Sequence, residues 1–148
     1  MIIQFIVCFF ATLSFAVLFS APKRQLLFCG FTGAAGWMVY LFLIEANAGL
    51  ALANLAASFT LTLMSRIFAA IEQHPVTVYL LAGIFPLVPG AGIYYTSYYF
   101  IMHQMEQFAA KGAETLIIAG SIVFGIVFGF ALPHSLFNTL GRLHEKKH

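Results

Sequence analysis

The sequence predicts an all-α integral membrane protein, a bundle of five transmembrane helices whose fourth helix is broken between Pro86 and Gly90. Three observations lead to this prediction. Hydrophobic residues make up 61% of the 148 residues and charged residues only 8%, whereas a soluble domain carries about 25% charged residues. The apolar residues form long runs, and the basic residues gather in alternate joints between these runs. We therefore expect the lipid bilayer to surround most of the chain.

Five apolar runs set the expected spans. A helix needs about 20 mostly apolar residues to cross a hydrocarbon core about 30 Å thick. The runs cover residues 2–19, 26–44, 48–65, 76–102 and 115–140. Residues 1–148 are therefore expected to form a single transmembrane domain. The first run has no basic residue before it, and Lys23 and Arg24 follow it, which favours a retained span over a cleaved signal peptide.

The basic residues predict the orientation. With five spans, the joints or tail after the first, third and fifth spans lie on one side of the membrane. The other side holds a single basic residue, Lys111. The first side holds six, which are Lys23, Arg24, Arg66, Arg142, Lys146 and Lys147. Because loops rich in Lys and Arg stay in the cytoplasm, we expect the N-terminus outside and the C-terminus in the cytoplasm.

Side chains that carry enzyme chemistry are scarce. The chain has no Asp, and its five Glu residues fall at span ends, in joints or in the tail. It has no Ser/His/Asp set and no glycine-rich phosphate loop. His103 and Glu106 have a ligand-like spacing, but a metal needs three or four ligands. We expect no enzyme activity, cofactor or metal, and a net charge of +2 does not indicate nucleic-acid binding.

The third expected span carries a stripe of polar and small residues. Asn54, Ser58 and Thr62 follow one another at helical spacing, which places them on one face. The same face holds Asn47, Ala51 and Ser65, and the opposite face holds Leu50, Leu61 and Met64. Two interpretations stay open. The stripe lines a path for a polar solute, or it packs against another helix through small residues and interhelical hydrogen bonds.

Glycines form a second pattern, in the second and fifth expected spans. Small residues let helix backbones approach closely, so we predict that these glycines mark helix-packing faces. They are Gly30, Gly33, Gly36, Gly125 and Gly129. Such faces also allow copies of the chain to associate, so homo-oligomers are compatible with the sequence.

The fourth span contains the sharpest local feature. Pro86 and Pro89 remove two backbone donors and clash with the preceding turn, and Gly90 loosens the backbone further. Such a break marks the solute site in many secondary transporters, and it is also compatible with a simple proline kink. A half-helix that starts near Gly90 has free amides, which favour an anionic group such as a carboxylate. The candidate substrate-binding residues are Pro86, Pro89, Gly90, Tyr94, Asn54, Ser58 and Thr62.

Several motifs, spread over nearly the whole chain, resemble those of the threonine/serine exporter family. They are Ser65-Arg66, His74-Pro75, the run from Pro86 to Gly90 with Tyr94 behind it, the joint from Ala21 to Arg24, and the stretch from Gly33 to Trp37. The resemblance is to the small five-helix module of the family, the ThrE_2-type half. In that family the module is fused to, or paired with, a larger five-helix half that bears a polar N-terminal domain.

The resemblance implies that this chain is the small subunit of a split exporter in the bacterial cytoplasmic membrane. It implies export of threonine and serine, or of a dicarboxylate such as succinate, driven by proton-motive force. The larger partner subunit is then expected to supply most of the titratable groups, because no carboxylate falls in mid-span here. The alternative is a membrane scaffold or assembly subunit that does not transport.

Overall fold

The computed structural model describes residues 1–133, whose regular secondary structure is entirely helical. They form six α-helices and two short 3-10 helices, with no strand among them. The elements in chain order are α1 (Ile2–Leu18), η1 (Lys23–Gln25), α2 (Leu26–Glu45), α3 (Leu50–Glu72), α4 (Val76–Ile84), η2 (Phe85–Leu87), α5 (Gly90–Ile101) and α6 (Met105–Ala131). The all-α class expected from the sequence is confirmed.

Three helical segments are long and apolar enough to cross a membrane, namely Lys23–Glu45, Leu50–Glu72 and Met105–Ala131. A fourth span is added if the bent pair Val76–Leu87 and Gly90–Ile101 is counted as one. The first expected span is a shorter apolar helix, α1, of 17 residues. The protein is therefore a multi-pass membrane protein.

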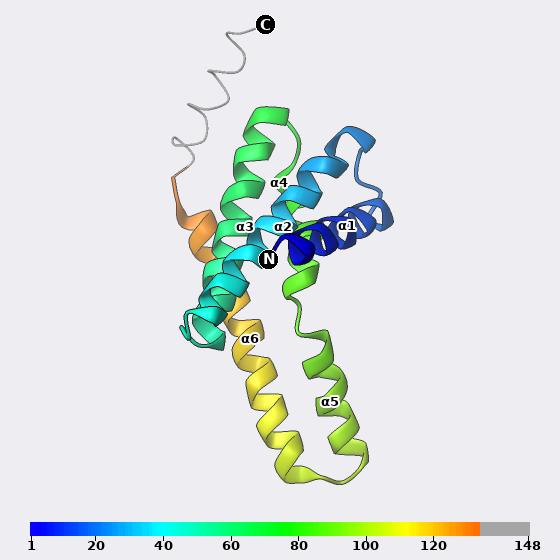
Figure 1. Ribbon diagram of the computed structural model, residues 1–148, viewed down its shortest axis with the longest axis vertical. Helices are drawn as coiled ribbons and strands as arrows, with labels where there is room; N and C mark the ends of the chain where they lie inside the picture. Colours follow the sequence, from blue (N-terminus) through cyan, green and yellow to red (C-terminus); the bar gives the residue numbers. More distant parts are fainter. Residues whose placement is uncertain (134–148) are drawn as a thin grey trace, which may run out of the picture.

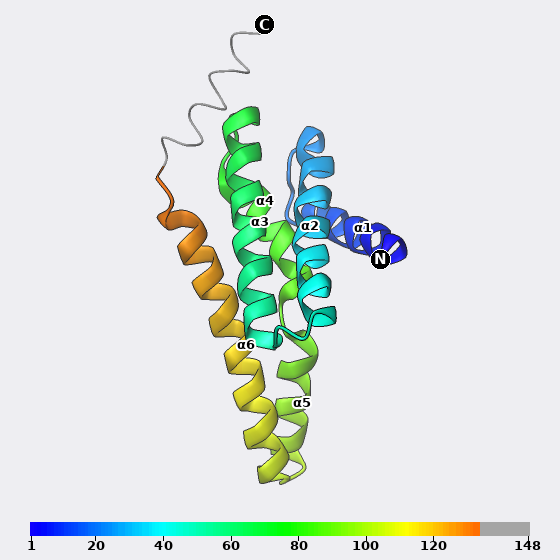
Figure 2. The ribbon, with the colours of Figure 1, turned by 60° about the vertical axis from the view of Figure 1, so that its left-hand side comes forward.

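The helices are arranged around α3, which packs against α2 on one side and α6 on another (Figures 1 and 2). In both views α1 lies across the long axis of the molecule, whereas α2, α3 and α6 follow it. The α5–α6 hairpin runs past the ends of α2 and α3. The α1–α2 and α3–α4 joints lie at one end of the molecule, and the α2–α3 and α5–α6 joints lie toward the other end.

Two helices extend beyond the expected spans. α3 continues to Glu72 rather than ending near residue 65, and α6 begins at Met105 rather than near residue 115. Hydropathy marks the apolar part of a helix, whereas Ala, Met, Glu, Gln and Lys continue the helix outside that part. At its other end α6 stops at Ala131, because Leu132 precedes a proline. Residues 134–140 of the fifth expected span, and the basic residues beyond them, lie outside the described residues.

Glycines join α1 to α2. A side-chain carbon at Gly30 would lie 2.7 Å from the ring of Phe9, and one at Gly33 would overlap the hydroxyl of Thr12. Real Cβ atoms essentially never come so close. The two backbones therefore approach to a distance that only glycine allows.

Glycines also allow α2 and α6 to approach α3 closely. A Cβ at Gly36 would lie 3.2 Å from the side chain of Leu61, and one at Gly129 would lie 2.6 Å from that of Thr62. At Gly125 a Cβ would overlap both the hydroxyl of Ser58 and a backbone carbonyl of α3. The predicted packing glycines of the second and fifth spans thus lie at interhelical contacts.

Leu61, on the face of α3 opposite the polar stripe, is also covered by other helices. It is fully buried and forms a core cluster with Ala57, Leu87 and Ile122. The reason is that α3 is covered on more than one side, by α2, α4 and α6. A single polar stripe therefore does not define which residues of this helix are buried.

Arg66 lies inside α3, not in the joint where the end of the apolar run predicts it, and it is only 5% exposed. Its Nη1 donates hydrogen bonds to the carbonyls of Gly129 at 2.7 Å and Leu132 at 2.9 Å. These carbonyls belong to the C-terminal end of α6, where the helix dipole favours a cation. Arg66 therefore caps α6 and ties it to α3.

A buried polar contact closes the end of the molecule near the α3–α4 joint. The hydroxyl of Tyr79 in α4 donates to Oε1 of Gln25 at 2.7 Å. The amide of Gln25 in turn donates to Oε2 of Glu72 at 3.2 Å. Tyr79 and Gln25 are both almost completely buried. The contact joins α4, η1 and the end of α3.

Candidate functional site

A small cavity lies beside the interruption between α4 and α5. The chain leaves α4 at Ile84, makes the 3-10 turn η2 and resumes as α5 at Gly90, with a bend of 52°. Pro86 and Pro89 supply no amide hydrogens here, so a straight helix cannot form. The cavity has a volume of about 160 Å³. Its lining residues are Trp37, Tyr40, Asn54, Pro86, Leu87, Val88, Pro89 and Ile118.

The interruption leaves backbone groups without partners. The Gly90 amide is not free, because it donates to the Val88 carbonyl at 2.8 Å. The next two amides, those of Ala91 and Gly92, donate to no backbone carbonyl within residues 1–133. The carbonyls of Pro86 and Leu87, two of the cavity residues, likewise accept no backbone amide there. The break thus offers acceptors at the cavity and donors at the start of α5.

Asn54 supplies a polar side chain to the cavity from α3. It is 3% exposed, and its Nδ2 donates to the Leu50 carbonyl of its own helix at 2.8 Å. Its Oδ1 accepts no hydrogen bond from residues 1–133. Since none of the fully buried side-chain polar atoms in that part of the chain lacks a partner, this oxygen must border the open space. Because Asn54 lines the cavity, this oxygen is an acceptor available to a solute there.

Trp37 and Tyr40 form the α2 wall of the cavity, and the sequence reading did not single them out as lining residues. Their rings stack with centroids 5.1 Å apart and an interplanar angle of 29°. The close contact of Gly36 with Leu61 holds α2 against α3 at this point. The available signal was the position of Trp37 next to a packing glycine, but the face of α2 that meets the break is decided only in three dimensions.

Ser58 and Thr62 do not line this cavity. Both are fully buried between α3 and α6, against Gly125 and Gly129. Each hydroxyl donates to the carbonyl four residues earlier in α3, at 2.8 Å. A hydroxyl that bonds within its own helix needs neither water nor solute. This part of the polar stripe therefore serves close contact between helices through small residues and does not line a solute path.

Tyr94 and Gly90 lie outside the cavity, on α5, none of whose 12 residues is buried. Tyr94 is 63% exposed and stacks on Tyr98, with ring centroids 6.5 Å apart. A Cβ at Gly90 would meet no atom within 4 Å. The structure thus brings together Asn54, Pro86 and Pro89 from the candidate set, and leaves Gly90 and Tyr94 at the exposed start of α5.

The chemistry of the cavity is neutral and polar on one side. No charged side chain lines it, and residues 1–133 contain no group of three or more His, Cys, Asp or Glu side chains that could hold a metal. The volume corresponds to about five water molecules at about 30 Å³ each. Such a cavity can hold a small solute, with acceptors for an ammonium group and, at the nearby start of α5, donors for a carboxylate.

Comparison with known proteins places the chain in a family. An uncharacterized protein of Haemophilus influenzae is 27% identical over 130 residues. That alignment covers 83% of this chain and 43% of the relative, so the chain spans less than half the length of the relative. No solved structure matches the chain. The family described as "Threonine/Serine exporter, ThrE" matches residues 4–131. The chain therefore belongs to the threonine/serine exporter family, as the motifs around the break had indicated.

Proposed function

We propose that this protein is the small subunit of a two-component secondary exporter that moves small hydrophilic metabolites out of the cell across the bacterial cytoplasmic membrane. The observation that carries the proposal is the cavity at the break, which Asn54 lines with a side-chain oxygen that has no protein partner. Inside a membrane protein, an acceptor of this kind favours a polar ligand or water beside it. Membership of an exporter family supports the same conclusion.

The solute that this cavity suits best is an amino acid such as threonine or serine. Its lining offers acceptors for an ammonium group, and the free amides of Ala91 and Gly92 begin the nearby helix. A hydrogen bond to a charged group is worth about 1.5–3 kcal/mol. A dicarboxylate such as succinate brings a second negative charge, and none of the residues lining the cavity is a Lys or Arg. We therefore favour the zwitterion over the dianion.

The proposed topology has five spans, with the N-terminus outside and the C-terminus in the cytoplasm. It counts the broken α4–α5 pair as one membrane-crossing segment in addition to the three long helices, and it requires α1, which lies across the long axis of the molecule in Figures 1 and 2, to turn toward the membrane normal. The 17 residues of α1 rise about 25 Å at about 1.5 Å per residue. In this orientation Lys23 and Arg24 face the cytoplasm, as the distribution of basic residues requires.

A second subunit completes the proposed exporter. We take it to be a larger five-helix membrane protein with a polar N-terminal domain, and we assign the proton-coupling groups to it. This division is supported by the uncharged lining of the cavity. It is also supported by the relative, which has more than half of its length outside the region that this chain matches.

One observation favours the alternative, a scaffold or assembly subunit without transport activity. Ser58 and Thr62 satisfy their hydroxyls within α3 and serve close contact with α6. If the partner contains the whole solute path, this chain only supports it. Transport measurements with variants of the cavity residues separate the two functions.

The deciding experiment measures export of labelled threonine, serine and succinate from cells that express this chain, the larger subunit, or both. The proposal expects export of threonine or serine only when both are present. Export by the larger subunit alone at the same rate would assign this chain to the scaffold function. Export of succinate in preference to threonine would overturn the choice of solute.

A further inference from the structure

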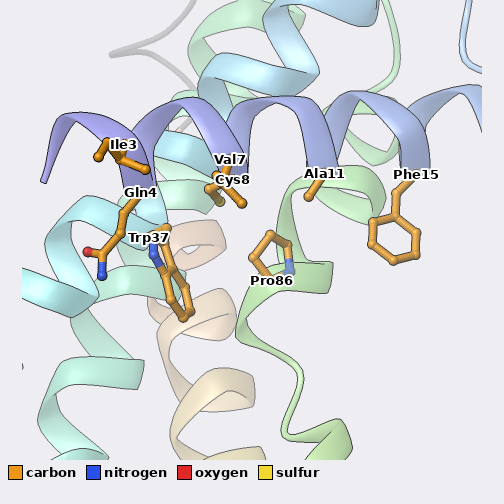
Figure 3. Close-up of a pocket in the computed structure, with 8 residues that line it drawn as sticks. All are labelled: Ile3, Gln4, Val7, Cys8, Ala11, Phe15, Trp37 and Pro86. Atoms are coloured by element: carbon orange, nitrogen blue, oxygen red, sulfur yellow. The ribbon is translucent and has the colours of Figure 1, made fainter.

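A second cavity adjoins the first on the side of α1. It has a volume of about 300 Å³ and lies in a groove beneath α1, whose floor is formed by Trp37 and Pro86 (Figure 3). The groove is mainly apolar, and Ile3, Val7, Ala11 and Phe15 contribute side chains to it from α1. It therefore suits a hydrocarbon group and offers little to a charged one.

Trp37 and Pro86 are shared by the two cavities. They are the two residues that line both the groove under α1 and the polar cavity beside Asn54. The two spaces are thus neighbours with a common wall of one indole ring and one proline ring. Removal of either ring would join an apolar space of about 300 Å³ to a polar one of about 160 Å³.

Trp37 is the side chain of this wall that is able to turn. The ring of Pro86 is part of the backbone of η2 and cannot rotate away from it. Trp37 is only partly buried, and its ring is held from one side by the stacked ring of Tyr40. Its backbone, in contrast, is fixed by the close contact between Gly36 and α3. The position of the indole therefore sets the size of the polar cavity.

We infer that Trp37 is the residue that limits solute size, and that the groove under α1 is a subsite for an apolar side chain, which the Trp37 ring separates from the polar cavity. This inference rests on the proposed transport of amino acids. With the indole in place, the polar cavity accepts a short side chain such as that of threonine. Without it, the groove admits a larger apolar side chain such as that of leucine, while the polar groups at Asn54 and the break still hold the backbone of the amino acid.

The test compares export of labelled leucine and threonine from cells that express both subunits, with the wild-type chain, Trp37→Ala or Trp37→Phe. The ratio of leucine to threonine export should rise at least about tenfold in Trp37→Ala, because even one methylene in an apolar pocket changes specificity by about 10-fold to 200-fold. Trp37→Phe should give a smaller rise in the same direction, and it decides the question if Trp37→Ala fails to reach the membrane.

Two further variants separate specificity from a general loosening of the fold. Phe42→Ala removes a ring from the same helix, but that ring is 64% exposed and lines neither cavity. It should leave the ratio unchanged. Ala11→Leu, added to Trp37→Ala, refills the groove and should lower the ratio again.

The outcomes are distinct for the inference and for the proposed function. An unchanged ratio in both Trp37 variants, with normal threonine export, overturns the inference and leaves the proposed function standing. The same rise in Phe42→Ala, or no reversal by Ala11→Leu, also overturns it. If the wild-type pair exports neither amino acid, the proposed function fails and the inference fails with it.

Discussion

Two glycines of α6 offer a matched test of how closely α3 and α6 approach. A Cβ added at Gly125 would overlap the hydroxyl of Ser58 and the carbonyl of Leu55, and it would lie 3.0 Å from the amide of Phe59. A Cβ added at Gly120, in the same helix, would meet no atom within 4 Å. We expect Gly125→Ala to destabilise the protein and Gly120→Ala to leave it as stable as, or more stable than, the wild type.

The magnitude follows from the contacts. Replacing glycine by alanine inside a helix stabilises it by about 0.5–1 kcal/mol, and this gain is common to both variants. The difference between the variants is therefore the cost of overpacking, about 1–3 kcal/mol. We expect the upper part of this range for Gly125. Two of the three nearest atoms belong to the backbone of α3 and cannot rotate aside, as a side chain would.

The measurement is unfolding of the purified protein by sodium dodecyl sulfate in mixed micelles, followed by far-UV circular dichroism. Trp37, the single tryptophan of the chain, gives a second signal. Agreement of the two signals tests whether unfolding is two-state. If Gly125→Ala resists detergent as well as Gly120→Ala does, then α3 and α6 do not meet as closely as described, and the assignment of Ser58 to a helix contact is wrong.

Three other predictions concern the site and the orientation. Gly90→Leu should abolish threonine export, because the new side chain covers the amides that begin α5. The protein should still accumulate in the membrane, since the space around Gly90 is open. Normal export would show that the break is only a kink. Asn54→Ala should reduce threonine export by about 10-fold to 150-fold, the value of one hydrogen bond to a charged group. This loss should exceed that of Leu52→Ala, whose side chain is 52% exposed, and equal effects would remove Asn54 from the site. In a cysteine-free background, a membrane-impermeant maleimide should label Lys111→Cys in intact cells and label Lys23→Cys only after permeabilisation, and the opposite pattern would reverse the topology.

Much of the fold was predictable because it depends on properties local in the chain. The apolar runs located most of the helices, and Pro86 and Pro89 marked the segment between α4 and α5, since a missing amide hydrogen acts wherever the residue lies. The glycine pattern also predicted close contacts, although it did not name partners. The structure supplies them, for instance Gly33 with Thr12.

The remainder depends on how the helices are rotated against one another. A stripe of hydroxyls looks the same in the sequence whether it faces a solute path or another helix. In the structure the hydroxyls of Ser58 and Thr62 bond to the backbone of their own helix, which favours contact with another helix. Nothing in helical spacing alone shows that Trp37 meets the break. Arg66 follows the end of an apolar run and is therefore expected in a joint, whereas in the structure it caps a neighbouring helix.

The Arg66 cap has a consequence for motion during transport. Alternating access requires one part of a transporter to rock against another. Arg66 links α3 to the end of α6 by hydrogen bonds, and Gly125 and Gly129 allow close contact of the two helices further along. These contacts join α3 and α6 along much of their length, and α5, none of whose residues is buried, packs against α6 with Gly92 close to Thr115. On the proposed function, we expect the segment between Pro86 and Pro89, which lines the cavity, to be the point at which the chain bends during such a motion.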